Sequence, residues 1–310
     1  MAGESRLLTL DVVVPTYNRA DLLARTLASI AAAVKPESLD WHVTVVDNNS
    51  KDATRDTVDG FIRQLGPRRV AYVFEARPGR SSALNTGISS SQRSVVGMID
   101  DDEEIAPNWF EAIAEWFARD DIDFIGGPCR PRWGADPPAW LPDRPGVIGA
   151  TEIGLAQPVF FSEYAGNLMG GNAVIRRSVF DRLGLYSPNL GRTDKRLLSC
   201  EDHDFYERIQ AAGIRGMFVP DLVVYHWVPP ERLTKSYYRR WSFWRAVSLS
   251  VMARNRPSNV STLFGAPRWV FGAALRKTPD LLRRWRAPEA FEAELLWWDL
   301  AGYLYGRRMR

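Results

Sequence analysis

The chain has 310 residues, of which 45% are hydrophobic and 25% are charged. This composition is ordinary for a globular protein and excludes a largely disordered chain. No apolar run approaches the roughly 18 to 20 residues of a membrane-spanning helix. The first residues, MAGESRLLTLDVVVPTYN, place a charge and a proline where a signal peptide needs its apolar core. Cys129 and Cys200 lie far apart and form no CxxC pair. We therefore expect a cytoplasmic protein with two reduced thiols and no zinc site.

The net charge of +3 hides an uneven distribution along the chain. Residues 232–310 contain 16 Lys and Arg against 5 Asp and Glu, whereas residues 1–231 contain 24 against 32. The same C-terminal stretch holds half of the 12 tryptophans. An acidic body and a basic, aromatic tail therefore call for separate interpretations.

Short apolar runs alternate with amphipathic stretches in the first half of the chain, which predicts a mostly parallel sheet covered by helices. Ser50 is a candidate cap for the helix after the second strand. Each strand ends in polar or acidic residues, and open α/β sheets bind ligands beyond the carboxyl ends of their strands. The predicted strands are 10–15, 41–47, 70–75 and 95–100.

Residues 126–149 are rich in Pro, Gly and Trp and lack clear periodicity, as is typical of a lid or binding loop. Helix and strand patterns return over 170–220, and basic, aromatic helices are expected from about residue 231. The predicted domains are a catalytic domain over 1–235, with a nucleotide-sugar half (1–125) and an acceptor half (126–235), and a helical region over 236–310. Helix breaks are expected near Pro257, Pro267, Pro279 and Pro288.

Five consecutive acids, residues 100–104, follow the apolar run that ends at Ile99. Close exposed pairs of carboxylates repel one another by roughly 1 kcal/mol, so a cation is a natural partner. A divalent ion with oxygen ligands would supply that cation. A solvated acidic turn before the helix expected at Pro107 is the structural alternative.

A second acidic group, residues 201–204, stands where a helix begins. Carboxylates at a helix start usually cap it. A cap does not need all four polar groups, and a carboxylate near a hydroxyl nucleophile can act as a general base.

One of only three histidines, His226, follows an apolar strand. A lone histidine is more often a hydrogen-bonded structural residue than a ligand. Near a carboxylate-bound ion, however, imidazole suits a transition metal such as Mn²⁺.

Taken in chain order, these features resemble the family 2 glycosyltransferases of the GT-A fold over about residues 9 to 235. VVVPTYNR at 12–19 is similar to the family's first strand and nucleotide-contacting turn, and VVDNNS at 45–50 contains its base-reading carboxylate. RPGRSSALNTG at 77–87 resembles the loop and helix start that line the donor pocket. The acidic cluster falls at the DxD motif, best aligned as residues 100–102. The donor contacts that this resemblance implies are Pro15, Thr16, Tyr17, Asn18, Arg19, Asp47, Asn48, Arg77, Gly79, Ser81, Asn85, Asp100 and Asp101.

Three further motifs extend the resemblance, although residues 236–310 match no general family pattern. GGNAVIRR at 170–177 resembles the acceptor-side glycine motif, Glu201-Asp202 resembles the pair that carries the base, and His226 resembles a late histidine that completes the metal site in some members. The residues expected at the acceptor are Gly170, Gly171, Asn172, Trp227 and Trp133.

The resemblance implies a GT-A fold, Rossmann-like, with a mostly parallel central sheet flanked by helices, and an inverting transfer from a nucleotide-sugar. Asp102 and His226 would hold Mn²⁺ or Mg²⁺, and Asp100 would support the metal, its waters or the ribose. Asp202 is the expected general base. Glu201 would position acceptor hydroxyls or hold Asp202, and an exchange of these two roles stays open.

Asp47 can accept hydrogen bonds from a pyrimidine imide or a guanine amine, so it suits either base. Family frequency alone favours UDP. The acceptor is expected to be a glycan, a lipid-linked molecule or a small molecule in bacterial polysaccharide or glycoconjugate synthesis. Residues 133–140 contain aromatic faces on which a sugar could lie, with hydrophobic packing as the alternative.

The basic tail, residues 236–310, has three interpretations. It could contact the inner face of a membrane, where each basic residue contributes about 1 kcal/mol near anionic lipid. It could equally be a helical subdomain with inward tryptophans, or a homodimer contact. No recognised motif supports nucleic-acid binding.

Other functional classes fit less well. A nucleotidyltransferase lacks its Gly-rich basic signature after the first strand, and a nicotinamide-dependent dehydrogenase lacks GxGxxG. A sugar-nucleotide-binding protein without transfer activity would not need the candidate metal and base residues.

Overall fold

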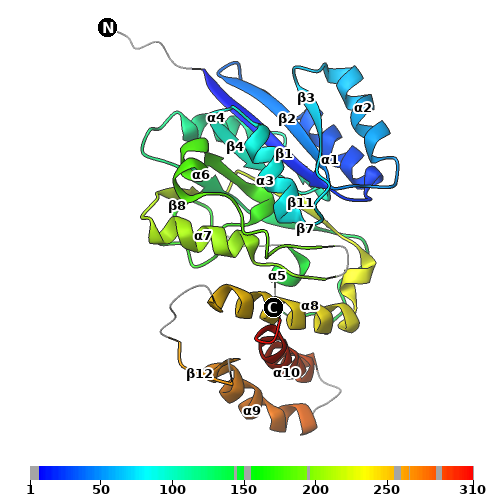
Figure 1. Cartoon of the computed structure of the whole chain (residues 1–310), viewed down its shortest axis with the longest axis vertical. Coiled ribbons are helices and arrows are strands. Elements are labelled where there is room, and N and C mark those ends of the chain that lie inside the picture. Colours follow the sequence, from blue (N-terminus) through cyan, green and yellow to red (C-terminus); the bar gives the residue numbers. More distant parts are fainter. Residues whose placement is uncertain are drawn as a thin grey trace. The chain divides into compact units, whose positions relative to one another are not determined.

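A computed structural model describes residues 7–142, 145–149, 155–193, 196–254, 260–264, 266–283 and 288–309 of the chain (Figure 1). The chain forms two compact units, and each draws on three stretches of sequence, whereas the predicted domains are continuous. Unit 1 comprises Met1–Arg130, Thr151–Pro188 and Asp202–His226, and unit 2 comprises Pro131–Ala150, Asn189–Glu201 and Trp227–Arg310.

The centre of unit 1 is an eight-stranded sheet in the order β3-β2-β1-β4-β9-β6-β10-β8. The first four strands pair in parallel at the predicted places, which confirms the predicted α/β class. β9 runs antiparallel between β4 and β6. The strands are β1 (Leu8–Thr16), β2 (Leu39–Asp47), β3 (Val70–Phe74), β4 (Val95–Met98), β6 (Phe124–Gly126), β8 (Val159–Phe160), β9 (Ala173–Arg176) and β10 (Gly216–Phe218).

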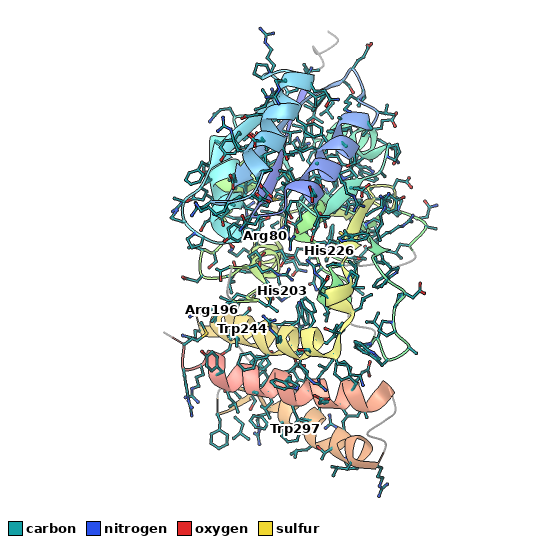
Figure 2. All side chains as sticks on the ribbon, turned by 90° about the vertical axis from the view of Figure 1, so that its right-hand side faces the viewer. Arg80, Arg196, His203, His226, Trp244 and Trp297 are labelled. Atoms are coloured by element: carbon teal, nitrogen blue, oxygen red, sulfur yellow. The ribbon has the colours of Figure 1, made fainter. Side chains whose placement is uncertain are left out.

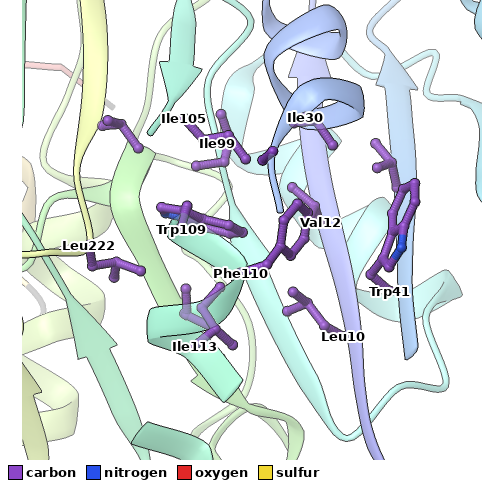
Figure 3. Packing of buried hydrophobic residues seen from close by; sticks show 14 of the residues in the cluster. Leu10, Val12, Ile30, Trp41, Ile99, Ile105, Trp109, Phe110, Ile113 and Leu222 are labelled. Atoms are coloured by element: carbon purple, nitrogen blue, oxygen red, sulfur yellow. The ribbon is translucent and has the colours of Figure 1, made fainter. Parts of the chain in front are cut away.

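Helices cover both faces of this sheet, so its central strands are apolar on both sides. In β1, Val12 and Val14 enter one core cluster and Val13 enters the other. Figure 3 shows the first cluster, where Trp109 and Phe110 pack beside Val12. The helices of unit 1 are α1 (Ala20–Ala32), α2 (Thr54–Leu65), α3 (Arg80–Ser90), α4 (Trp109–Phe117) and α6 (Arg177–Leu183), with the 3₁₀ turn η1 (Gly170–Asn172); α7 (Glu201–Ala211) begins at the boundary of the two units.

The expected cap at Ser50 is wrong. α2 begins at Thr54, and the Asp52 carboxylate accepts hydrogen bonds from both the amide and the hydroxyl of that threonine. The Ser50 hydroxyl instead accepts the amide of Asn18 at 2.9 Å. Ser50 therefore joins the turns that follow β1 and β2.

A second sheet has the order β5-β11-β7 and is formed by β5 (Glu103–Ile105), β7 (Cys129–Trp133) and β11 (Val224–Val228). Its strand β7 occupies part of the 126–149 segment that was expected to be a loop. Antiparallel pairing places His226 opposite Glu103. The acidic cluster and the late histidine are thus neighbours, although more than 120 residues separate them in sequence.

Unit 2 is mainly helical, as expected for residues 236–310. α10 packs against both α8 and α9, and Tyr238 and Trp241 of α8 share a core with Phe291 and Leu295 of α10. The elements are α5 (Pro145–Ile148), η2 (Pro230–Leu233), α8 (Lys235–Arg254), β12 (Thr262–Leu263), β13 (Ala266–Pro267), α9 (Arg268–Arg283) and α10 (Pro288–Gly306). None of the helices within the described residues is long and apolar enough to cross a membrane.

The expected helix breaks are confirmed at Pro267 and Pro288, which lie next to helix starts. The break expected at Pro279 is wrong, because α9 continues through it. Pro279 is exposed, so water can bond the carbonyl that the proline leaves without an amide partner. Pro257 lies outside the described residues.

Asn172 joins three segments of unit 1. It has no exposed surface, and its side-chain oxygen accepts the indole N–H of Trp109 at 3.0 Å. Its amide nitrogen donates to the carbonyl of Leu222 at 2.6 Å and to that of Pro128 at 3.2 Å. These bonds explain Asn172 structurally, and a direct contact with the acceptor stays a prediction.

We expect Asn172→Ala to lower the free energy of unfolding by about 2 to 4 kcal/mol, because the change leaves buried donors and acceptors without partners. Urea denaturation measures this loss. Asn108→Ala is the matched control, since that amide is exposed and its bond to the carbonyl of Asp221 is long, at 3.4 Å. Equal effects of the two changes would contradict the role given to Asn172.

Candidate active site

The strand ends of unit 1 bring the predicted motifs to one edge of the sheet. Thr16 pairs with Asp47 at the carboxyl ends of β1 and β2. β9 runs the other way and pairs Ala173 with Met98, so the Gly170–Asn172 turn lies beside the end of β4. The donor and acceptor motifs therefore meet at the edge where such sheets bind ligands.

Arginines balance the charge of the acidic cluster. Nη1 of Arg19 lies 3.0 Å from both Asp101 Oδ1 and Asp102 Oδ2. On the other side, Arg80 contacts Asp100 at 2.7 Å. The chain itself thus supplies cations to this cluster, and sequence reasoning did not single out Arg80. Its position directly after Gly79 in the RPGRSS motif was the available signal.

Burial changes the protonation of the cluster. It raises the pKa of Asp101 to about 6, against the opposing effect of Arg19. Burial would lower the pKa of Arg19, but Asp101 and Asp102 raise it above its usual value. The guanidinium of Arg19 stays protonated at every pH at which Asp101 titrates. A change of pH therefore alters the charge of the Asp101 carboxyl group and not that of Arg19.

Glu103 is a further buried acid that sequence reasoning did not place in the site. Burial, followed by the charge of Asp100, raises the pKa of Glu103 well above its usual range. Its Oε2 accepts the amide of Asp100 at 2.9 Å. A Cβ at residue 171 would clash with the Glu103 carboxyl group, which would then have to move. Gly171 therefore makes room for this carboxyl group.

Asp102 and His226 form the candidate metal pair. Nε2 of His226 lies 3.5 Å from Asp102 Oδ2, and both side chains are buried. Two ligand atoms that each lie about 2.1 Å from the same ion are separated by roughly 3 Å, so the spacing of Asp102 and His226 suits the binding of one ion between them. Within the residues that the structure describes, no three His, Cys, Asp or Glu side chains are grouped for a metal.

Asp202 is the second residue of α7, directly before His203, which is labelled in Figure 2. Its Oδ2 accepts the amide of Gly170 at 3.3 Å, and Oδ1 accepts the amide of His203 at 2.8 Å. A Cβ at residue 170 would lie 3.0 Å from Asp202 and 3.3 Å from Arg80. Asp202 and the Arg80–Asp100 pair therefore flank the same glycine. Glu201, which is buried, is the first residue of the helix.

Asp47, the carboxylate predicted to read the base, is held from two sides. Its oxygens accept the hydroxyl of Tyr72 and the amide of Ser50, both at 2.8 Å. Tyr72 was not predicted at the site. Tyr72 lies on β3 opposite Val45, two residues before the strand partner of Asp47, so only the pairing of β2 with β3 reveals this contact.

Two of the predicted donor residues, Asn48 and Asn85, hold neighbouring backbone segments through hydrogen bonds. Asn48 donates to the carbonyls of Glu75 and Arg77 and accepts the amide of Gly79, whose φ of 123° favours glycine. Asn85 accepts the amide of Tyr186 and donates to its carbonyl.

The remaining donor residues differ in exposure. Tyr17 and Arg77 are exposed and open to a ligand. The Thr16 hydroxyl donates to Asp101 at 2.8 Å, and Asn18 accepts the amide of Lys51. Pro15 and Ser81 are buried.

Trp133 and Trp227 belong to unit 2, whereas the acidic cluster belongs to unit 1. Trp227 packs over Gly134, where a Cβ would lie 2.9 Å from its ring. Trp133 packs on the core of unit 2, and the Trp140 ring meets those of Tyr238 and Phe291 edge-on. Hydrophobic packing therefore explains Trp140, and the acceptor contacts of Trp133 and Trp227 stay predictions.

The family model for "Glycosyl transferase family 2" matches residues 11–184. The chain belongs to this family. The match covers more than half of the chain and includes the acidic cluster and the glycine turn, which confirms the resemblance found in the sequence.

Curated relatives of this glycosyltransferase include "Succinoglycan biosynthesis protein ExoM" from Rhizobium meliloti, which is 29% identical over 76% of this chain and 72% of the relative. Another is "Glucosyl-dolichyl phosphate glucuronosyltransferase" from Haloferax volcanii, 28% identical over 78% of this chain and 76% of the relative. Such relatives connect the family 2 domain with polysaccharide and glycoconjugate synthesis.

A similar solved structure is the mannosyltransferase PcManGT of Pyrobaculum calidifontis, crystallised with GDP-Man and Mn²⁺. Its TM-score is 0.65 at 20% identity, covering 96% of this chain and 86% of that one. GalNAc-T7, crystallised with UDP, GalNAc and Mn²⁺, gives a TM-score of 0.56 at 20% identity, over 82% of this chain and 52% of that one. At these identities the likeness establishes the GT-A fold.

The carboxylate of Glu75 stabilises the loop that leads to Arg77. This carboxylate accepts the Arg77 amide at 2.7 Å and the guanidinium at 2.9 and 3.1 Å, together with the Thr86 hydroxyl. Hydrogen bonds from Arg77, followed in size by the opposing effect of burial, leave the pKa of Glu75 at about 2, against 4.5 ordinarily.

Glu75→Gln should therefore destabilise the enzyme above pH 4.5, and the difference from wild type should shrink as the pH falls towards 2. The sign follows because the unfolded chain takes up the proton first, so the stabilisation is lost on acidification. Denaturant unfolding at several pH values measures the effect, with the exposed Glu115→Gln as control. A constant difference between pH 7 and pH 3 would contradict it.

Proposed function

We propose that this glycosyltransferase moves a sugar from a nucleotide-diphosphate sugar to an acceptor hydroxyl with inversion, and that it depends on Mn²⁺ or Mg²⁺. The observation that carries the proposal is the buried Asp102–His226 pair at 3.5 Å, at the same strand edge as Asp100 and Asp202. The rival, a sugar-nucleotide-binding protein without transfer, does not require Asp202 beside the glycine turn.

The residues present fit a divalent ion that is completed by its substrate. Mg²⁺ and similar ions bind through one or two carboxylates plus substrate phosphates and waters. Asp102 and His226 would hold the ion, with Asp100 beside it. A bound ion supplies Lewis acidity to the leaving diphosphate. Arg19 contacts the same Oδ2 of Asp102, so it must give up that contact when an ion binds.

The transfer step needs a proton acceptor on the acceptor side. The acceptor oxygen attacks the anomeric carbon, the bond from that carbon to the diphosphate oxygen breaks, and the hydroxyl proton passes to Asp202. The Gly170 amide, at 3.3 Å, orients this carboxylate. Displacement from the opposite face inverts the anomeric centre. Glu201 positions acceptor hydroxyls or Asp202, and it is the next candidate for the base.

Asp47 would read the base of the nucleotide, since Tyr72 and Ser50 fix its carboxylate. UDP is the proposed nucleotide. The similar solved structures named above contain GDP-Man or UDP, which supports a nucleotide donor without selecting one. A binding screen of UDP-, GDP- and dTDP-sugars with Mn²⁺ decides between them.

The names of the relatives support a glycan or lipid-linked acceptor in polysaccharide or glycoconjugate synthesis. A small-molecule acceptor fits the same chemistry. The proposed location is the cytoplasm, with contact to the inner face of the membrane.

We expect Asp102→Ala to abolish the gain in nucleotide affinity that Mn²⁺ gives, because the ion loses its carboxylate ligand. Isothermal titration calorimetry with UDP, with and without Mn²⁺, measures that gain. The fold should persist, since the change relieves an acidic cluster and removes no core packing.

Glu104→Ala is the control, because Glu104 belongs to the same cluster but bonds Arg25. Its metal-dependent affinity should match the wild type. An unchanged Mn²⁺ effect in Asp102→Ala would remove this residue from the metal site.

Asp202→Asn should leave the nucleotide affinity within a few fold and lower transfer at least ~100-fold, the scale of a lost general base. Release of the nucleotide diphosphate from the donor, with and without acceptor, measures turnover. Loss of turnover without loss of binding would exclude the binding-protein alternative.

Asp204→Asn is the matched control on the same helix, where Asp204 pairs with Arg208 at 3.1 Å. It should keep near-normal turnover. If Asp202→Asn also does, the base is reassigned, and Glu201→Gln is the next variant.

A further inference from the structure

Helix α9 of unit 2 has one covered face and one uncovered face (Figure 1). Val270 and Ala274 are buried and pack with Leu300 and Tyr303. The opposite side exposes three large apolar side chains, with Trp269 at 61%, Leu275 at 62% and Leu282 at 73% of their surface. An amphipathic helix normally turns such residues inward, so this face is the unusual feature of α9.

Basic side chains alternate with these apolar ones on the same face. Positions 268, 272, 275, 276, 279, 282 and 283 follow the i, i+4, i+7 spacing of a single helix face. Arg268, Arg276 and Arg283 are exposed along it. The sequence of the helix contains four basic residues and one acid, Asp280.

The preceding hairpin extends the apolar surface. Phe264, between β12 and β13, is 70% exposed, and Leu263 beside it is also exposed. The φ of Phe264 is 51°, in the left-handed region that a bulky residue seldom adopts. A large apolar ring is thus presented to solvent next to the start of α9.

The tryptophans of α10 are placed differently from the exposed residues of α9. Trp297 and Trp298 of α10 are about two-fifths exposed, but Trp298 donates its indole N–H to Glu294 at 3.1 Å. The same glutamate pairs with Arg239 of α8. Glu294 and Arg239 therefore balance each other beside Trp298 within unit 2.

We propose that the exposed face of α9, with Phe264, is the surface by which this protein lies on an anionic lipid bilayer. Arginines interleaved with Leu and Trp suit an interface that is apolar inside and negative at its surface. A protein partner is disfavoured by size. A helix of 16 residues is about 24 Å long, and one of its faces falls short of the roughly 800 Å² per partner in stable complexes.

The proposal narrows the predicted membrane contact from residues 236–310 to α9 and its hairpin. It is independent of the proposed function, because none of its residues belongs to the proposed metal, donor or base groups. Metal-dependent UDP binding, measured without vesicles, should be unchanged in every variant below.

Co-sedimentation of the full-length protein with vesicles tests the proposal. Vesicles of phosphatidylcholine with about one third phosphatidylglycerol should bind it at low salt, and binding should weaken as salt screens the charges. Vesicles of phosphatidylcholine alone should bind at least about tenfold less. A wild-type protein that stays in the supernatant with anionic vesicles at low salt overturns the proposal.

Two double variants locate the surface. Arg268→Gln with Arg276→Gln, and Leu275→Gln with Leu282→Gln, should each lower the partition onto anionic vesicles at least about tenfold. Arg63→Gln with Arg68→Gln removes the same charge from exposed positions of unit 1 and should change little. Equal losses in this control would show a general charge effect and overturn the assignment to α9.

Light scattering after gel filtration separates lipid from a second copy of the chain. The wild type and both α9 variants should have the same mass without vesicles. A wild-type dimer that the leucine variant converts to monomer would assign this face to self-association instead.

Discussion

The site depends on the charge balance at the end of β4. Asp100 and Asp101 follow a buried strand and cannot spread apart, so their repulsion must be offset nearby. Arg19 and Arg80 do this from the starts of two different helices. Burial reduces the remaining negative charge, because it raises the pKa of Asp101 and Glu103 and so favours their neutral forms. The neighbouring glycine turn, helix start and strand pairing are all arranged around these groups.

This arrangement bears on the proposed metal site. Arg19 and Arg80 already offset charge in the cluster, and the Asp102–His226 pair has a spacing that suits two ligands on one ion. Such a site binds an ion best when the diphosphate of the donor completes the coordination. We therefore infer that metal and donor bind together. Arg19 contacts Asp102 in this structure, and that contact has to change when metal and donor bind.

Unit 2 has a different physical character. Its helices bury aromatic residues such as Tyr238 and Phe291 in a core of their own, and Arg239 pairs with Glu294 on its surface. α9 departs from this pattern by exposing Leu and Trp beside exposed arginines. The membrane surface proposed for α9 would suit an enzyme that meets its acceptor at a lipid bilayer.

The sequence by itself determined the elements whose signals are local. The four parallel strands and a helix start within residues 201–204 are readable from periodicity and spacing, and the family 2 motifs are readable from their resemblance to known members. The tertiary structure alone decided what depends on pairing between distant segments. The β5–β11 register sets His226 beside Asp102, and the antiparallel entry of β9 sets Gly170 beside Asp202. It also assigned Asn172 to the scaffold and turned Leu275 and Leu282 of α9 outward. Helical spacing shows that residues share a face, but only packing against a neighbour decides which face is covered.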